Sequence, residues 1–289
     1  MSELKKVLIV ANIKKSNLEN LMIITKSVLE NRGIASYVVS PSYFKVDNHV
    51  LTDFDDGYKH NLYDLIIAIG GDGTFLYTAR TFLDFNIPIL GINLGRLGFL
   101  MEVNPDDIEN AIEKIITNKI DLKKRILLDV NVQRNNKQTY FFSFLNDAVV
   151  SKGVLSRMVE MQVSLDMEIL AQYRADGLIV STPTGSTAYN LAAGGPILTP
   201  DMEAMIISPI CPHSLGVRPL VTSKDKTLLI KIISGEEDTS ITIDGQENFY
   251  LKKDDCIIIS SSNRYIRIYD YGEGQFFSTL RGKMGWNVC

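Results

Sequence analysis

The stretch Ile69-Gly70-Gly71-Asp72-Gly73-Thr74-Phe75-Leu76 decides the fold of the first part of this chain. It follows the apolar run 64–69, which is short, β-branched and ended by glycines, as buried parallel strands are. Residues 75–83 then place apolar side chains at helical spacing. The stretch is therefore predicted to be a strand, a tight glycine turn and the start of a helix.

The glycines of this turn point to an anion site. They lack a Cβ, so the backbone can adopt positive φ and approach a ligand closely. The N–H groups of such a turn and of a helix N-terminus bind anions. Asp72 is unusual in a loop that only holds phosphate, and it suits a loop that also places a metal ion or accepts a proton. The alternative is a plain glycine turn in which Asp72 caps the helix.

Length and composition describe an ordinary globular protein. The 289 residues are 45% hydrophobic and 22% charged, with a net charge of −4, enough for a sizeable core and for two domains. No basic block indicates a nucleic-acid surface, and no apolar run indicates a membrane span. The N-terminus does not have the pattern of a signal peptide, and three scattered cysteines predict neither a disulfide framework nor a zinc site. We therefore expect a cytoplasmic protein.

In the first hundred residues, predicted strands and helices alternate, as in an α/β layer. Strands are predicted at 6–11, 35–39 and 88–92, and helices at 16–31 and 104–116. The first strand–helix turn has no glycine, so a G-x-G-x-x-G dinucleotide fold is not supported. Residues 47–63 are predicted to be a polar loop or short helix with two surface histidines, His49 and His60. A second glycine-rich bend covers residues 93–100.

From Arg125 onward strands dominate, apart from a helix predicted near 187–193. The predicted strands cover 127–133, 139–151, 159–170, 227–233, 240–244 and 256–260. The fold class is thus an α/β N-terminal domain plus an all-β, sandwich-like C-terminal domain. The predicted boundaries are 1–100 for the α/β domain, with a returning segment at about 265–289, and 101–264 for the β-rich domain.

Three polar stretches of the second domain are candidates for binding. Asn146-Asp147 can hold a ribose diol, because amide and carboxylate acceptors form a fork, although Asn-Asp is also an ordinary turn. The hydroxyl-rich stretch 182–189 can bind phosphate or cap a helix. Asp244-Gly245 is either a hairpin turn or a polar tip that faces a ligand. Ser186 as a hydrolase nucleophile is disfavoured, because the G-x-S-x-G elbow is absent. The role of His213 stays open.

Taken together, these motifs resemble the NAD kinases. Gly70-Gly71-Asp72-Gly73-Thr74, Asn146-Asp147, Thr182-Pro183-Thr184-Gly185-Ser186-Thr187-Ala188-Tyr189 and Asp244-Gly245-Gln246 occur in that family's order. The resemblance covers nearly the whole chain. Within the family, the chain is similar to the bacterial-type enzymes. It implies a site between two domains, and transfer of the γ-phosphoryl group of ATP to the 2′-hydroxyl of the adenosine ribose of NAD. Some members of the family use inorganic polyphosphate. The resemblance further implies a divalent metal, usually Mg²⁺ held mainly by ATP phosphates, and a homodimer or homotetramer.

The resemblance also assigns residues. Asp72 matches the proposed proton acceptor, and Gly70, Gly71, Gly73 and Thr74 form the phosphate loop. Asp147 stands where many members have Glu, which draws the carboxyl group back by one methylene. The positions that match NAD contacts are Asp72, Gly73, Asn146, Asp147, Arg157, Arg174, Asp176, Thr187, Ala188, Tyr189, Asn190, Leu191, Ala192 and Gln246.

Two other functions share some of these features. Lipid kinases of the diacylglycerol type carry a similar Gly-Gly-Asp-Gly loop, but they should also show a membrane-facing apolar or basic face, and none is evident. A non-catalytic NAD-binding regulator would bind NAD without consuming ATP. Asp72, intact in its loop, argues against this second alternative.

Overall fold

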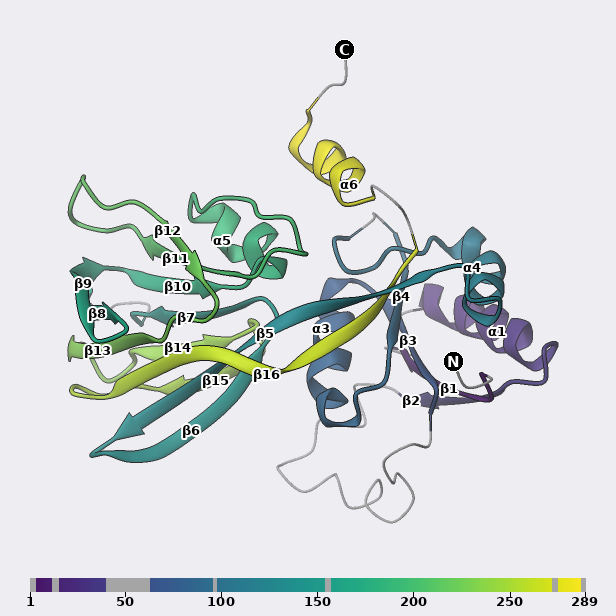
Figure 1. Ribbon diagram of the computed structural model, residues 1–289, viewed down its shortest axis with the longest axis horizontal. Helices are drawn as coiled ribbons and strands as arrows, with labels where there is room; N and C mark the ends of the chain where they lie inside the picture. Colours follow the sequence, from purple (N-terminus) through teal and green to yellow (C-terminus); the bar gives the residue numbers. More distant parts are fainter. Residues whose placement is uncertain are drawn as a thin grey trace. The chain divides into compact units, whose positions relative to one another are not determined.

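The computed structural model describes residues 4–11, 16–39, 63–95, 98–153, 157–271 and 275–286. Its contacts divide the chain into two compact units (Figure 1). Unit 1 comprises Met1–Lys124 and Ile266–Cys289, and unit 2 comprises Arg125–Tyr265. Most of the predicted polar loop 47–63, including His49 and His60, lies outside the described residues.

Unit 1 is built from a parallel sheet and helices. In chain order its elements are β1 (Lys6–Ala11), α1 (Ser16–Glu30), β2 (Ala35–Val39), β3 (Leu65–Gly70), α3 (Asp72–Thr81), η2 (Leu83–Phe85), β4 (Ile89–Asn93), η3 (Pro105–Asp107), α4 (Ile108–Ile116) and α6 (Gln275–Met284). β5 (Asp121–Arg134) begins in unit 1 and β16 (Cys256–Asp270) ends there.

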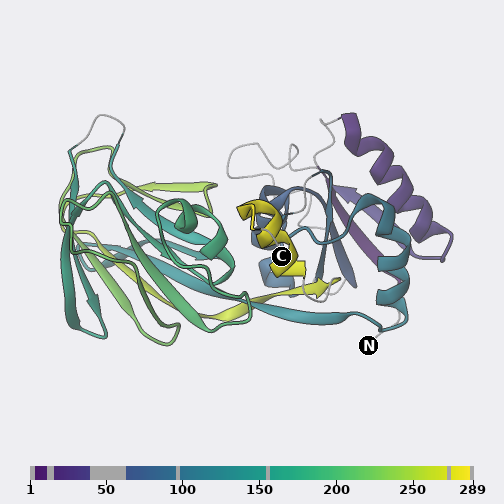
Figure 2. The same cartoon turned by 90° about the horizontal axis from the view of Figure 1, so that it is seen from above.

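The unit 1 sheet is covered by helices on both faces. Its strands lie in the order β2-β1-β3-β4-β16, and the pairs β1–β2, β1–β3, β3–β4 and β4–β16 are parallel. All six residues of β3 are buried, as expected for a strand covered on both sides. Figures 1 and 2 show α1 and α4 on one face of this sheet and α3 on the other. The α/β architecture predicted for the N-terminal part is therefore present.

Helix α4 extends unit 1 beyond the predicted boundary at residue 100. Its buried face, Ile108, Ala111, Ile112 and Ile115, shares one core with Leu18 of α1 and with alternate residues of β1 and β3. The contacts therefore change units after Lys124 rather than after residue 100. No helix in the described parts of the chain is long and apolar enough to cross a bilayer.

Unit 2 is almost entirely β-structure. Between β5 and β16 it contains β6 (Lys137–Phe144), β7 (Asp147–Ser151), β8 (Val159–Leu165), β9 (Glu168–Ala175), β10 (Gly177–Ser181), η4 (Thr184–Thr187), α5 (Tyr189–Ala192), β11 (Ala204–Ile210), β12 (Leu220–Ser223), β13 (Leu228–Ser234), β14 (Ser240–Ile243) and β15 (Glu247–Tyr250). In one sheet the order is β6-β5-β16-β13-β8-β9, and in the other it is β12-β11-β10-β7-β14-β15.

The two sheets of unit 2 enclose a single apolar core. Alternate residues such as Leu128 and Val130 of β5, and Leu178 and Val180 of β10, are buried together in it, as in a β-sandwich. The predicted sandwich-like domain is therefore confirmed.

Two predicted strands are wrong in extent. The run 139–151 is split into β6 and β7 by a turn at Leu145-Asn146, and 159–170 is split into β8 and β9 by a turn at Asp166-Met167. Asp166 and Met167 adopt positive φ values of 47° and 73°, which reverse the chain without glycine. Sequence periodicity cannot detect such turns, because the apolar pattern continues through them.

Candidate functional site

The predicted strand–turn–helix around Gly70 is present in unit 1. Gly71 is the N-cap of α3, and its carbonyl accepts the N–H groups of Thr74 and Phe75 at 2.8 and 3.2 Å. A Cβ on Gly70 would collide with the Thr74 side chain, whereas a Cβ on Gly71 or Gly73 would meet nothing within 4 Å. The turn is thus packed on the Gly70 side and open at Gly71 and Gly73.

Asp72 does not cap α3, because the N-cap residue is Gly71 and Asp72 is the first residue of the helix. Instead the N–H groups of Phe99 and Leu100 donate to its Oδ2 and Oδ1, both at 3.2 Å. A Cβ on Gly98 would lie within 3 Å of all three terminal atoms of this carboxyl group. The bend 98–100 therefore orients the Asp72 carboxylate, a role that its glycine content alone did not assign to it.

The Asn146-Asp147 turn in unit 2 is organised by the carboxylate of Asp244. Its Oδ2 accepts the N–H of Leu145 at 3.0 Å, and its Oδ1 accepts those of Asn146 and Asp147 at 2.7 and 3.1 Å. In return, the Asp244 N–H donates to the Asp147 carbonyl at 2.8 Å. The sequence predicted Asp244 as part of a hairpin turn or of a polar tip that faces a ligand, but not as the support of the 145–147 turn, because residues almost a hundred positions apart share no local pattern.

The side chain of Asn146 carries a buried acceptor without a donor among the described residues. The backbone carbonyl of Asn146 accepts hydrogen bonds from the Thr182 N–H at 2.9 Å and the Ser181 hydroxyl at 3.1 Å. Its Oδ1 is buried and accepts no hydrogen bond from the described residues. Because a buried acceptor without a donor is costly, this atom is a candidate acceptor for a ligand hydroxyl.

Asp147 is a buried carboxyl group whose charge is disfavoured. Burial, and to a lesser extent the neighbouring Asp244 carboxylate, together raise its pKa to about 7. A hydrogen bond from the Tyr189 backbone acts in the opposite direction. Asp147 can therefore hold or release a proton near neutral pH.

A cavity of about 460 Å³ in unit 2 brings part of the predicted set together. Asn146, Asp147, Ala188 and Tyr189 all line it. Asp244 and Gly245 of the third candidate stretch also line it, together with Val149, Ser151 and Thr242, which the sequence did not indicate. Three predicted stretches, far apart in sequence, thus meet at one hollow of the sandwich.

Asn190 is turned inward. Its amide nitrogen donates to the carbonyls of Ser186 and Pro196 at 3.1 and 3.0 Å, and its Oδ1 accepts the Ser208 hydroxyl at 2.7 Å. The side chain is fully buried. It therefore supports the 184–192 segment from within and offers no side-chain group to the cavity.

The other predicted contacts do not belong to the described lining of this cavity. Asp176 pairs with Lys152 at 2.9 Å, and the exposed Arg174 lies 3.7 Å from Glu160. The Thr187 hydroxyl donates to the Thr184 carbonyl at 3.4 Å. The remaining predicted contacts are Arg157, Ala192 and Gln246, which are exposed, and Leu191, which is half-buried.

The described residues contain no cluster of three His, Cys, Asp or Glu side chains that could hold a metal ion. The Gly70–Thr74 loop belongs to unit 1 and the 460 Å³ cavity to unit 2. The first contains backbone N–H groups and the carboxylate of Asp72, and the second contains the amide of Asn146 and the carboxyl groups of Asp147 and Asp244.

Comparison with known proteins gives one consistent family. Residues 7–120 match the ATP-NAD kinase N-terminal domain, and residues 145–271 match the ATP-NAD kinase C-terminal domain. The chain is 40% identical over 290 aligned residues to an NAD kinase of Treponema denticola, covering 98% of this chain and 97% of the relative. It is 38% identical to an NAD kinase of Aquifex aeolicus, covering 84% and 93%.

Solved structures show the same fold. A yeast NADH kinase complexed with NADH superimposes with a TM-score of 0.86 at 24% identity, covering 100% of this chain and 90% of that one. An NAD kinase from Archaeoglobus fulgidus in complex with ATP superimposes with a TM-score of 0.74 at 22% identity, covering 96% and 98%. These matches do not favour the lipid-kinase alternative.

Proposed function

The chain belongs to the NAD kinase family and is an enzyme that phosphorylates NAD, and we propose which of its residues perform each part of the reaction. The acceptor is the 2′-hydroxyl of the adenosine ribose, and the donor is ATP. The observation that carries this proposal is the Asn146-Asp147 turn, because both residues line one cavity and the buried Asn146 Oδ1 has no donor among the described residues. Adjacent ribose hydroxyls can donate to both groups.

Asp72 receives the proton of the 2′-hydroxyl. Each of its oxygens accepts one backbone N–H, and a carboxylate has about four acceptor positions, so it can still accept from a sugar hydroxyl. A sugar hydroxyl is a very weak acid. Proton transfer to Asp72 therefore comes late in a loose transition state, and the main contribution of Asp72 is to orient the nucleophile.

Gly70, Gly71, Gly73 and Thr74 form the phosphate-binding turn. It opens helix α3, whose positive N-terminal end favours a phosphate. The open space in front of Gly71 and Gly73 supports this assignment, because a side chain at either position would stand where a phosphate must come close. Thr74 packs against Gly70 and fixes the turn.

Mg²⁺ fits this chemistry with limited help from the protein. When bound with ATP, it would supply positive charge that offsets the negative charge developing during phosphoryl transfer. The 70–74 loop has a single carboxylate, that of Asp72, whose two oxygens already accept N–H groups. We therefore assign most Mg²⁺ ligands to ATP phosphates and water, as is usual for this ion.

The stretch 187–192 lies along the nucleotide and presents Ala188 and Tyr189 to it, supported by their position in the cavity lining. Arg157, Arg174, Asp176 and Gln246 supply further contacts, and the buried Asn190 acts by holding the stretch in place. We also propose that the enzyme works as a homodimer or homotetramer in the cytoplasm. Its free Cys211 and Cys256 suit a reducing compartment.

The substitution Asp72→Asn tests the assignment of the catalytic residue. NADP formation from NAD and ATP with Mg²⁺ should fall roughly 100-fold or more, while NAD binding measured by calorimetry should persist. Asp106→Asn, at an exposed carboxylate of the same unit, is the matched control and should keep full activity. Near wild-type turnover of Asp72→Asn would refute the role. Parallel assays with polyphosphate and with NADH define donor and acceptor preference.

A further inference from the structure

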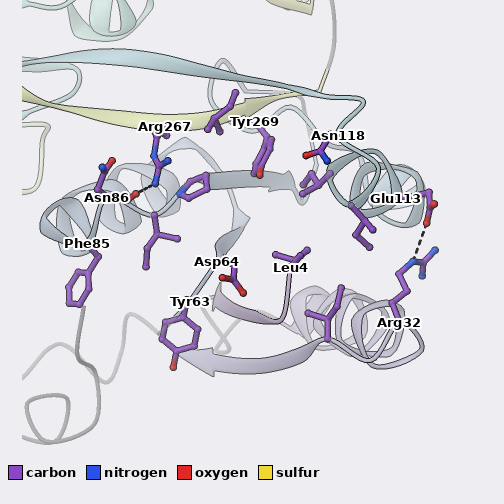
Figure 3. Close-up of a pocket in the computed structure, with 16 residues that line it drawn as sticks. Leu4, Arg32, Tyr63, Asp64, Phe85, Asn86, Glu113, Asn118, Arg267 and Tyr269 are labelled. Atoms are coloured by element: carbon purple, nitrogen blue, oxygen red, sulfur yellow. Dashed lines mark hydrogen bonds and ion pairs between the residues drawn. The ribbon is translucent and has the colours of Figure 1, made fainter. Parts of the chain in front are cut away.

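A second cavity, of about 800 Å³, lies in unit 1 at the edge of the sheet opposite the Gly70 turn (Figure 3). It is formed where the parallel strands begin. Leu4 precedes β1, Asp64 precedes β3 and Pro88 precedes β4, and all three residues line it. The six residues of β3 separate Asp64 from the phosphate-binding turn by roughly 20 Å at the usual strand rise. The cavity is therefore separate from the phosphate-binding turn.

Arg267 of β16 offers this cavity an unsatisfied donor. One guanidinium nitrogen, Nη2, donates to the Asn86 carbonyl, which fixes the orientation of the group. The Nε atom is buried and has no hydrogen-bond partner, and Arg267 forms no ion pair with any residue in the described parts of the chain. Arg32, also in the lining, differs because it is neutralised by Glu109 and Glu113 at 3.1 and 3.4 Å.

Asp64 offers the opposite charge. Its Oδ2 accepts the backbone N–H groups of Lys5 and Lys6 at 2.8 and 2.9 Å, so the carboxylate is held in place. Among the described residues no donor binds its Oδ1. Figure 3 shows Arg267 and Tyr269 along one wall and Asp64 on the facing side. A fixed cation and a fixed anion thus face one hollow without pairing with each other.

The rest of the lining combines apolar residues with the polar side chains of Asn86, Glu113 and Asn118. Ile34, Ile87 and Ile115 are almost fully buried beneath the cavity, and Ile116 and Leu122 extend this surface. The volume lies within the roughly 300–1,000 Å³ of small-molecule sites. A ligand that meets all these groups needs an acceptor for Arg267, a donor for Asp64 and an apolar body.

We propose that this cavity binds a small zwitterion with an apolar body, of which an α-amino acid with a bulky apolar side chain is the simplest example. The carboxylate binds side-on to the Arg267 guanidinium, including Nε, and the Tyr269 hydroxyl donates to it. Burial raises the pKa of Tyr269, so this hydroxyl stays protonated. The ammonium group binds Asp64, and the side chain covers the isoleucine surface. A simple anion would leave Asp64 unmatched, and a simple cation would leave Arg267 unmatched.

The first experiment measures binding to the full chain by calorimetry, with saturating NAD present to occupy the kinase site. The probes are L-phenylalanine, L-leucine and L-tryptophan. For phenylalanine, 3-phenylpropanoate lacks the ammonium group and 2-phenylethylamine lacks the carboxylate. The zwitterion should bind at least about tenfold more tightly than either half-molecule, because each lost charged hydrogen bond costs about that factor. Equal binding of a half-molecule, or no binding of any amino acid, would overturn the proposal.

Variants locate the binding. Arg267→Met keeps the apolar stem and removes the donors, and Asp64→Asn keeps an acceptor for Lys5 and Lys6 but removes the charge. Each should weaken phenylalanine binding at least about tenfold. Arg218→Met, at an exposed arginine of unit 2, is the control and should bind normally.

All three variants should retain NAD phosphorylation without the probe, which shows that they are folded. Undiminished amino-acid binding by Arg267→Met and Asp64→Asn would refute the site. Because Asp72→Asn should bind phenylalanine like the wild type, failure of this proposal and failure of the kinase assignment give different results.

Discussion

At the residue scale, the raised pKa of Asp147 makes the stability of unit 2 depend on pH. Its pKa of about 7 lies above the ordinary value of 3.8, so the folded protein holds this proton more tightly than the unfolded chain does. The stabilisation is fully present below pH 3.8 and is lost as the pH rises through 7. Above that pH a charged carboxylate is buried beside Asp244.

The substitution Asp147→Asn should therefore stabilise the protein at high pH only. In urea unfolding at pH 8.5 we expect a gain of roughly 2–4 kcal/mol over the wild type, shrinking towards zero near pH 4. The amide can still accept the Tyr189 N–H. Asp225→Asn, at an exposed aspartate of the same unit, should show no such trend. Parallel pH curves for wild type and Asp147→Asn would contradict the assigned pKa.

Single residues differ in how far the sequence can place them. Asp72 and the Asn146-Asp147 pair were proposed from the sequence because a carboxylate in a glycine turn, or beside an amide at a strand end, is chemically conspicuous. Asn190 lies in an equally polar stretch, yet its side-chain amide is hydrogen-bonded to Ser186, Pro196 and Ser208 inside the protein. Whether a polar side chain faces a ligand or the interior depends on these partners, and composition does not specify them.

At the element scale, the bend 98–100 and helix α3 share the task of holding Asp72. Gly98→Ala places a methyl group where the Asp72 carboxyl group lies, so the carboxylate must move. We expect kcat for NADP formation to fall roughly 100-fold, with the unfolding midpoint much less affected. Gly95→Ala is the control in the same bend, because a Cβ there meets nothing within 4 Å. Equal turnover by the two variants would show that the bend does not set the position of Asp72.

The turn between β6 and β7 depends on a single carboxylate from the β14–β15 turn. Asp244→Asn keeps one acceptor oxygen where two now bind three N–H groups. The turn should loosen, and KM for NAD should rise about tenfold or more with a smaller change in kcat. Removal of the charge should also lower the pKa of Asp147 and shift the pH profile of kcat/KM to lower pH. A loss of stability without that shift would reduce Asp244 to a structural role.

Asp254→Asn is the matched control for this experiment. Asp254 also adopts a positive φ, 67° compared with 48° for Asp244. In contrast to that of Asp244, the Asp254 carboxylate is exposed, and it forms an ion pair with the Lys231 ammonium at 3.4 Å. The same chemical change at a similar turn should leave KM for NAD and the pH profile unaltered.

Elements were predicted well where a local apolar pattern is bounded by glycines, and poorly where a distant partner makes the turn. The strand β3 and the turn after it follow directly from the run 64–71. The break at Leu145-Asn146 does not, because Leu145 continues the apolar pattern and the turn is stabilised by Asp244. Helix α4 was predicted correctly, but it belongs to unit 1 because it packs against α1 in one core, which the sequence does not show.

At the scale of the whole molecule, the change of texture at Arg125 was sufficient to predict two domains, and each has a core of its own. Val7, Ile67 and Ile112 belong to the core of unit 1, while Leu128, Ile230 and Ile241 belong to that of unit 2. The chain nevertheless passes between the units within β5 and β16, in mid-strand. A boundary inside a strand leaves no linker composition in the sequence.

Separate cores predict that damage in one unit stays local. Ile67→Ala and Ile230→Ala each remove a fully buried side chain and should each cost about 2–5 kcal/mol. Hydrogen exchange read by mass spectrometry should then accelerate in peptides of β1, β3 and β4 for Ile67→Ala, and in peptides of β8, β13 and the first part of β16 for Ile230→Ala. Each variant is the control for the other, since the same substitution is made in a different unit. A uniform acceleration across both units, from either variant, would mean that β5 and β16 couple the two cores into one unfolding unit.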